Sequence, residues 1–148
     1  MVSATSDCVF CGIVDGRNPS SVVYQDKSVI AFLDIQPVTP GHTLVIPRSH
    51  AASLAELAAR DGERMFAAGQ LCAAALRKSS VKCEGVNMSL ADGEVAGQEV
   101  FHVHLHVFPR FSGDGFGLKF GPDYRKTLPS RSELDRIASL LRVNVPSA

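Results

Sequence analysis

Three histidines alternate with apolar residues in the segment Phe101–Phe108, and a row of imidazoles can do chemistry. Alternation with a period of two is typical of a strand, so His102, His104 and His106 are expected on one face of it. Imidazole titrates near neutral pH and can act as a nucleophile, a proton carrier or a metal ligand. We interpret the row as catalytic. A metal site without catalysis and a purely structural strand are the alternatives.

Five segments of the chain predict strands of a sheet that would position these histidines. They are rich in β-branched and aromatic residues or alternate in polarity, and they cover residues 22–24, 28–34, 43–46, 85–90 and 101–108. Residues 25–27 are expected to form the turn between the first two strands, and Pro109 is expected to end the last one. Residues 91–97 carry two glycines and an acidic pair, which predicts a loop before the histidines.

Two longer segments predict helices, because their apolar residues recur at helical spacing. The first covers residues 53–78, where alanine is abundant and Gly62 is expected to separate a short helix from a longer one. The second, residues 130–142, opens on a capping box in which Ser130 precedes Glu133 by three positions. With a further helical turn near the N-terminus, the order of elements predicts the α+β class. We expect one antiparallel sheet with helices packed on one side.

The composition fits one globular domain of residues 1–148, with a core of about residues 8–120 and a helical extension at about 130–142. The 15 Lys and Arg balance the 15 Asp and Glu, so the net charge gives no reason to expect nucleic acid or an anionic membrane as a partner. No apolar run reaches the length of about 18 residues that a membrane span needs. Residues 1–7 lack the features of a signal peptide, so a cytoplasmic location is expected. The four cysteines are then expected as reduced thiols, either ligands or core residues.

Further blocks accompany the histidine row, and together they have the order of a known family. The row from His102 to Phe108 matches the motif His-φ-His-φ-His-φ-φ, where φ is apolar, at every position. The other blocks are residues 8–14, 31–35 and 41–47 and the pair Gly97-Gln98. On these residues the chain resembles the histidine triad (HIT) superfamily, in the nucleotide-binding hydrolase branch with bacterial-type, zinc-containing members. The resemblance implies a HIT-like fold and a homodimer.

The resemblance implies a nucleotide hydrolase that works in two steps. His104 would attack the α-phosphate of a nucleotide conjugate and form a covalent nucleotidyl-histidine, from which water would release a nucleoside monophosphate. His106 would contact phosphate oxygens or assist the leaving group, and His42 would lie near the phosphates. The implied substrates are purine nucleoside phosphoramidates, dinucleoside polyphosphates or related nucleotidyl conjugates.

Other residues match family positions that hold the nucleoside. Asp34 would accept hydrogen bonds from the ribose hydroxyls, and Gln98 would supply an amide donor. An apolar slot around the base would be formed by Val9, Phe10, Phe32 and Ile35. For each member of this slot, ordinary core packing is the alternative.

A zinc site is the second chemical expectation. Cys8 and Cys11 have the Cys-x-x-Cys spacing of a metal knuckle, which is a weak signal alone because a closed site needs two more ligands. The resemblance supplies them as His50 and His102. A Cys2His2 set would be a structural site and would leave two of the three histidines free for chemistry. Two buried, reduced cysteines are the alternative.

The resemblance also implies how two copies of the chain would meet. The dimer contact would involve the helix of residues 63–78 and the strand edge before it. The glycine-rich tract of residues 113–118 would cross towards the partner's site.

Two positions depart from the family pattern. Ala91 stands where Asn or Gln is usual, and Glu99 stands where Ser or Thr often lies near the leaving group. A carboxylate beside a phosphate is repulsive unless it is protonated or turned away, which leaves the substrate preference open. Two other functions are considered: nucleotidyl transfer to an acceptor other than water, and a nucleotide-binding or scaffold protein with weak catalysis. Val103 and His106 argue against the transferase branch, which typically has proline and glutamine there, and His104 argues against a scaffold.

Overall fold

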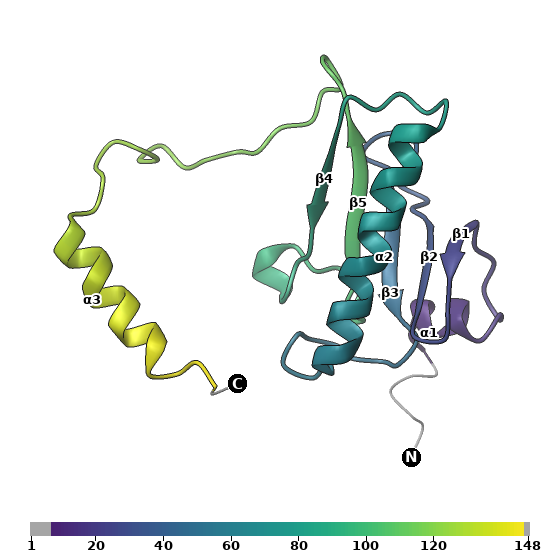
Figure 1. The fold of residues 1–148 in the computed structure, drawn as a ribbon, viewed down its shortest axis with the longest axis horizontal. Helices are drawn as coiled ribbons and strands as arrows, with labels where there is room; N and C mark the ends of the chain where they lie inside the picture. The colour runs from purple at the N-terminus through teal and green to yellow at the C-terminus, as the bar shows by residue number, and fades with distance from the viewer. Residues whose placement is uncertain (1–6, 147–148) are drawn as a thin grey trace. The chain divides into compact units, whose positions relative to one another are not determined.

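The computed structural model describes residues 7–146 of the chain. Along the chain, the elements are α1 (Val9–Val14), β1 (Val22–Gln25), β2 (Val29–Leu33), β3 (Thr43–Pro47), α2 (Ala59–Lys78), β4 (Gly85–Ser89), the short 3-10 helix η1 (Glu94–Ala96), β5 (Leu105–Arg110) and α3 (Arg131–Arg142), as Figure 1 shows. The chain divides into two compact units, Met1–Gly115 and Phe116–Ala148.

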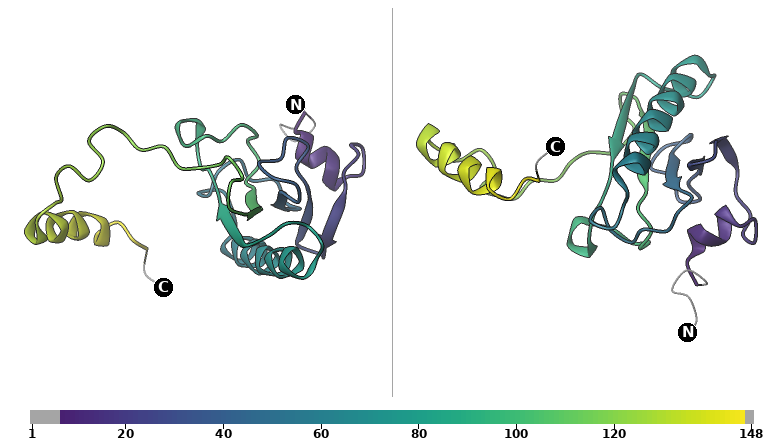
Figure 2. Two further views of the ribbon diagram at one scale, coloured as in Figure 1. Left: turned by 90° about the horizontal axis from the view of Figure 1, so that it is seen from above. Right: turned by 60° about the horizontal axis from the view of Figure 1, so that its bottom comes forward.

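The first unit is built on one antiparallel sheet with the strand order β1-β2-β3-β5-β4. Helix α2 lies along one face of it, whereas α1 lies against the opposite face (Figures 1 and 2). The α+β class and the antiparallel sheet are therefore confirmed. The expectation that the helices pack on one side is wrong, because the apolar α1 has its own layer on the second face.

The alternation of side chains in β2 explains why both faces are covered. Val29 and Ala31 belong to the cluster under α2, whereas Ile30 and Phe32 point to the other face and pack with Phe10 of α1. All four strand residues are at least 96% buried, since the most exposed of them, Ile30, keeps 4% of its surface. A central strand that is apolar on both sides needs a layer on each face.

The histidine row is only partly strand. Strand β5 begins at Leu105, after His102 and His104, and it continues through Pro109, which was expected to end it. The segment before β5 is held by single hydrogen bonds; for example, the amide of Val103 donates to the carbonyl of Ala51 at 2.8 Å. The expected alternation is nevertheless present, because the apolar partners of the histidines pack under α2.

Helix α2 is one helix and not two. It starts at Ala59 and contains Gly62, and the residues before it form turns in which the amide of Glu56 donates to the carbonyl of Ser53 at 3.2 Å. Gly69 lies on the face of α2 that packs against β4 and β5. A Cβ at Gly69 would lie 2.5 Å from the terminal methyl of Met88 and 3.0 Å from a methyl of Leu105, so a larger residue there would oblige these side chains to shift.

The second unit contains α3, which begins as expected from the capping box. The hydroxyl of Ser130 accepts a hydrogen bond from the amide of Glu133 at 3.2 Å. In residues 7–146, no helix combines the length and the apolar character that a membrane crossing requires.

Candidate functional site

A cleft of about 1120 Å³ opens on the α1 face of the sheet. Its walls come from α1 and the loop after it, from β2 and the loop that leads to β3, and from the segments 97–100 and 104–106. Three of the chain's five histidines line it, namely His42, His104 and His106. Its charged residues are Asp34 and Glu99, and no lysine or arginine of the described residues 7–146 contributes to the lining. The cleft is therefore apolar at the sheet, rich in imidazole at one end, and without a fixed cation.

His104 has one possible protonation pattern when it is neutral. Its Nδ1 lies 2.8 Å from the backbone carbonyl of His102, and because a carbonyl only accepts, Nδ1 must carry the proton. The ring is 94% buried and packs against the Phe10 ring at 5.2 Å. The Nε2 atom of His104 consequently keeps its lone pair, which is the form that a nitrogen nucleophile needs.

His42 and His106 form a chain of hydrogen bonds with a fixed direction. The amide of Val38 donates to Nδ1 of His42 at 3.0 Å, so the His42 proton must be on Nε2. That Nε2–H donates to Nδ1 of His106 at 2.9 Å. His106 must then carry its own proton on Nε2. The Val38 amide thus makes His106 a donor towards the cleft, whereas the carbonyl of His102 makes His104 an acceptor.

Burial keeps this histidine pair uncharged. Desolvation lowers the pKa of His42, and the nearby Asp34 carboxylate only partly opposes the shift. Desolvation, followed by the neighbouring imidazoles of His104 and His42, lowers the pKa of His106 to about 4. Near neutral pH, His106 is therefore a neutral hydrogen-bond donor. Ligand atoms of Asp34, His42 and His106 also lie within 4.8 Å of one another. The tautomer of His42 argues against a metal ion there, because its Nε2 atom carries a proton and has no lone pair for a metal.

Asp34 lies at the open side of the cleft. One of its carboxylate oxygens accepts from the amide of Gln36 at 2.8 Å, and the other lies 3.6 Å from Nε2 of His42. Its side chain keeps 17% of its surface exposed, so each oxygen still has a lone pair available to a bound molecule.

The four expected apolar residues all line the cleft, but to different depths. Phe10 and Phe32 are buried and meet edge to face with ring centroids 5.6 Å apart. Val9 is 47% exposed and Ile35 is 95% exposed, so these two form the rim of the cleft. The floor is thus shared with the core, whereas the rim side chains face solvent.

A second cluster lies on the other side of Phe10. The sulfur atoms of Cys8 and Cys11 and the Nδ1 atoms of His50 and His102 all lie within 4.8 Å of one another. Nδ1 of His102 is 3.5 Å from the Cys8 sulfur and 3.6 Å from the Cys11 sulfur, and Nδ1 of His50 is 3.3 Å from the Cys11 sulfur. A tetrahedral zinc ion about 2.3 Å from sulfur and about 2.0 Å from nitrogen sets sulfur–nitrogen separations of about 3.5 Å.

The hydrogen bonds of the cluster also fit a metal. Nε2 of His102 lies 2.9 Å from the carbonyl of Pro47 and must carry the ring proton, which leaves the Nδ1 lone pair to face the sulfurs. Burial, together with the neighbouring Cys8, raises the pKa of the Cys11 thiol to about 11. The Cys11 thiol therefore needs a nearby cation to release its proton, and a set of two sulfurs and two imidazole nitrogens suits a thiolate-binding metal such as zinc.

One residue that was expected to bind the nucleotide, Gln98, does not reach the cleft. Gln98 is buried, and its amide group donates to the carbonyls of Ala52 and Val100 at 2.8 and 3.2 Å, while its oxygen accepts from the amide of Gly93. It shapes the loop before the histidines and has no donor left for a ligand. Ala91 does not line the cleft either, whereas Glu99 does and is exposed.

The sequence pattern missed the loop after α1. Asn18 lines the cleft and donates from its side chain to the carbonyl of Val9 at 3.0 Å, which fixes the loop against α1. A Cβ at Gly12 would lie 2.2 Å from the Asn18 side chain. The turn at Asn18-Pro19 was visible in the sequence, but its position beside the cleft depends on this tertiary contact.

Comparisons with known proteins agree with the geometry. The HIT domain family model matches residues 15–113. An uncharacterized HIT-like protein of Borreliella burgdorferi is 48% identical over 116 residues, which is 78% of this chain and 84% of that protein. A Zn-bound histidine triad family protein from Mycobacterium smegmatis has a TM-score of 0.74 at 38% identity, over 96% of this chain and all of that one. A histidine triad nucleotide-binding protein from Candida albicans has a TM-score of 0.80 at 26% identity, over 93% and 96% of the two chains. The chain belongs to the HIT family.

Proposed function

We propose that the protein is a nucleotide hydrolase that acts through a covalent nucleotide on His104. The substrates would be purine nucleoside phosphoramidates, dinucleoside polyphosphates or related nucleotidyl conjugates. The observation that carries the proposal is the bond from Nδ1 of His104 to the carbonyl of His102, at 2.8 Å. It leaves Nε2 of the neutral His104 ring without a proton, inside a cleft that also offers an apolar floor and the Asp34 carboxylate.

In the first step, Nε2 of His104 attacks the α-phosphorus, and the bond from phosphorus to the leaving group breaks. The Nε2–H of the neutral His106 stays on its ring and donates a hydrogen bond to the leaving group, which takes its proton from solvent water. In the second step, water attacks the phosphorus, and the bond to His104 breaks to release the nucleoside monophosphate. Both ring nitrogens of His42 are engaged, so His42 acts on the phosphate through His106 and not by direct contact.

The nucleoside would bind on the residues 9–44 side of the cleft. A purine ring would lie against Phe10 and Phe32, with Val9 and Ile35 at the rim, and the ribose hydroxyls would donate to Asp34. Since apolar contact reads few edge atoms of the base, we expect little discrimination between adenine and guanine.

We also propose one structural zinc ion per chain, held by Cys8, Cys11, His50 and His102. The distances in the cluster and the Zn-bound relative from Mycobacterium smegmatis support this assignment. Bound there, zinc would link α1 to the histidine segment. It would have a structural role and would take no part in the reaction.

We propose a homodimer through α2, which carries Phe66 and Leu71 with 57% and 53% of their surfaces exposed. Light scattering at several protein concentrations would test the proposed assembly. A nucleotidyltransferase, or a nucleotide-binding scaffold with weak catalysis, is the alternative to hydrolysis.

The test of the hydrolase is to trap the intermediate. Wild-type protein is mixed briefly with an adenylyl phosphoramidate, quenched and measured by mass spectrometry. We expect one added nucleotidyl group on His104 and a loss of several orders of magnitude in rate for His104→Asn, which keeps the shape of the side chain but not the nucleophile. An adduct on His106, or full turnover by the variant, would contradict the assignment. An acceptor-dependent reaction would instead favour the transferase.

A further inference from the structure

The direction of the histidine chain is set by a backbone amide in a loop. The loop of residues 34–42 joins β2 to β3, and within it the amide of Val38 donates to Nδ1 of His42. The amide of His42 donates in turn to the carbonyl of Thr39 at 3.0 Å, which closes a tight turn. Two neutral tautomers of an imidazole differ little in intrinsic free energy, so the partner that is held in place selects between them. The position of this loop therefore matters to the protons of the site.

One side-chain bond ties the loop to the strand that carries His106. The hydroxyl of Thr39 donates to the carbonyl of Pro109 at 2.6 Å, and Thr39 is 97% buried. The pairing of β3 with β5 runs from Val45 opposite Leu105 to Thr43 opposite Val107. Continued by two residues, this register would place Gly41 opposite Pro109. The backbone leaves the sheet at Gly41, where φ is +98°. The carbonyl of Pro109 therefore accepts from the hydroxyl of Thr39 and not from a backbone amide of β3.

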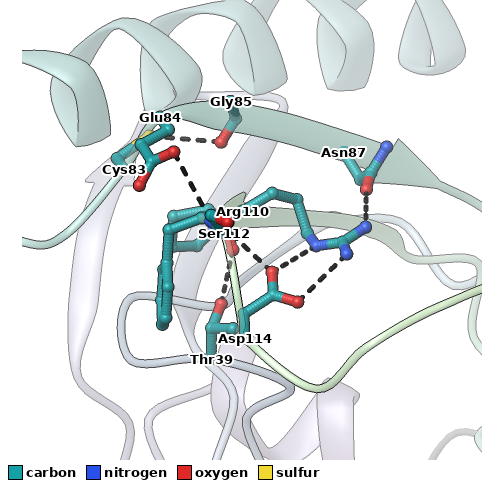
Figure 3. A network of polar contacts seen from close by, with 10 residues as sticks. Thr39, Cys83, Glu84, Gly85, Asn87, Arg110, Ser112 and Asp114 are labelled. Atoms are coloured by element: carbon teal, nitrogen blue, oxygen red, sulfur yellow. Dashed lines mark hydrogen bonds and ion pairs between the residues drawn. The ribbon is translucent and has the colours of Figure 1, made fainter.

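The acceptor of this bond is itself well anchored. Next to Pro109, the guanidinium of Arg110 donates to the Asp114 carboxylate at 2.6 and 3.1 Å and to the Asn87 side chain at 2.6 Å (Figure 3). The carbonyl of Arg110 also accepts from the amide of Glu84 on the β4 side. The end of β5 is thus fixed to β4 and to the following turn, and Thr39 attaches the loop to this fixed point.

We propose that Thr39 is a positioning residue that selects the tautomer of His106. Its bond to Pro109 holds the Val38 amide against His42, which keeps the protons of His42 and His106 on Nε2. If the loop moved away, His42 could carry its proton on Nδ1 and accept at Nε2. His106 would then place its proton on Nδ1, towards His42, and present a bare Nε2 to the cleft. The consequence for catalysis rests on the proposed function, whereas the tautomer does not.

The direct test is nitrogen-15 NMR of zinc-loaded protein labelled at histidine. In the wild type we expect His42 and His106 protonated on Nε2 and His104 protonated on Nδ1. Thr39→Val keeps the shape of the side chain but removes the donor. In this variant, at least about a tenth of His42 and His106 should move to the Nδ1 tautomer, while His104 stays unchanged. Thr39→Ser keeps the hydroxyl and should restore the wild-type pattern.

A matched control is available in the same segment. Thr43 is also buried, and its hydroxyl donates to the carbonyl of Gly41 at 3.0 Å without reaching β5. Thr43→Val should leave all three tautomers unchanged. A wild-type pattern in Thr39→Val, or the same change in Thr43→Val, would overturn the proposal. If Thr39→Val does not fold, Thr39→Ala removes the same donor with less steric demand.

Turnover provides a second measurement. Because Thr39 itself does not line the cleft, Thr39→Val should lower kcat in proportion to the fraction of His106 that moves to the Nδ1 tautomer and leave KM within about twofold, as expected when a group acts on the transition state. Absence of turnover by the wild type would contradict the hydrolase, and the NMR result would still decide the role of Thr39. If the tautomers of Thr39→Val change while kcat does not, Thr39 positions His106, but the tautomer of His106 does not affect the rate.

Discussion

The ring Nδ1–H of His104 donates a hydrogen bond to the backbone carbonyl of His102, with an Nδ1–O distance of 2.8 Å. The side chain of His102 belongs to the cysteine–histidine cluster, and the ring of His104 faces the cleft. Phe10 contacts both rings, with centroid separations of 5.9 and 5.2 Å. A metal ion in the cluster would therefore hold both the carbonyl that orients His104 and the aromatic floor of the cleft.

Purification without added metal should yield about one zinc ion per chain by elemental analysis. Cys8→Ala should remove most of this zinc and lower the free energy of unfolding by several kcal/mol, because the binding energy of a structural zinc is also folding energy. Cys83→Ala is the matched control, since Cys83 is outside the cluster and should retain the metal. Absence of zinc from the purified wild type, together with an unchanged thermal stability of Cys8→Ala, would mean that the site does not exist.

The sequence predicted much of the site because its signals were local. The alternation around His104 identifies the face of the strand, and the Cys8–Cys11 spacing identifies half of the metal cluster. The tautomers could not be predicted in this way. They depend on the amide of Val38 and on the hydroxyl of Thr39, neither of which has a recognisable residue type for the task.

The predictions from sequence that were wrong for the fold and the site have physical causes that residue spacing does not show. Gly62 resembled a helix break, but it lies in the first turn of α2, where a glycine interrupts no established helix. Gln98 resembled a ligand-binding amide, but its buried position obliges it to satisfy backbone groups first. Pro109 has no backbone N–H to donate, but β3 has no residue paired with it, so its place in β5 leaves no hydrogen bond to β3 unmade.

Stability in acid should depend on Asp26, which joins the start of β2 to α2. Its carboxylate accepts from Arg64 and from the amides of Ser28 and Val29, and these bonds hold its pKa well below the ordinary value. The stabilisation is fully present above the pKa of the unfolded chain, about 4, and is lost as pH falls through that value towards the lower folded pKa. Asp26→Ala should cost about 1–2 kcal/mol at pH 7 and progressively less below pH 4, as measured by urea unfolding.

The control for this prediction is Asp15→Ala. Asp15 pairs with Arg17 at 3.2 Å, but both side chains are more than half exposed, so its removal should change stability little at any pH. A constant difference between wild type and Asp26→Ala from pH 7 to pH 3 would show that packing, and not the carboxylate charge, accounts for the effect.

Asp34 should distinguish ribose from deoxyribose. Asp34→Ala should weaken binding of a nucleoside monophosphate by about 1–3 kcal/mol, and the loss should be much smaller for the 2′-deoxy analogue, which already lacks one donor. Isothermal titration with both ligands makes the measurement, with the deoxy ligand as the internal control. Equal losses for the two ligands would assign Asp34 to the support of His42 and the Gln36 turn.

Glu99 should decide which leaving groups the cleft accepts. The nucleoside would occupy the walls formed by residues 9–44, which leaves the wall of residues 97–100 to the leaving group. Glu99 and Asp34 are the charged residues that line the cleft, with no lysine or arginine among the described lining residues to offset a polyphosphate. A unit charge at about 4 Å in water is worth about 1 kcal/mol, or roughly fivefold in rate.

Glu99→Gln should therefore raise kcat/KM for a dinucleoside polyphosphate by about fivefold or more, and change kcat/KM for a simple nucleoside phosphoramidate by less than about twofold. Raising the ionic strength should shrink the difference between wild type and variant, because exposed charges are screened. Glu94→Gln removes a carboxylate from the same loop outside the cleft and should leave both substrates unaffected. An unchanged ratio of the two substrates in Glu99→Gln would mean that the carboxylate is turned away from the leaving group, and that another feature of the cleft sets the preference.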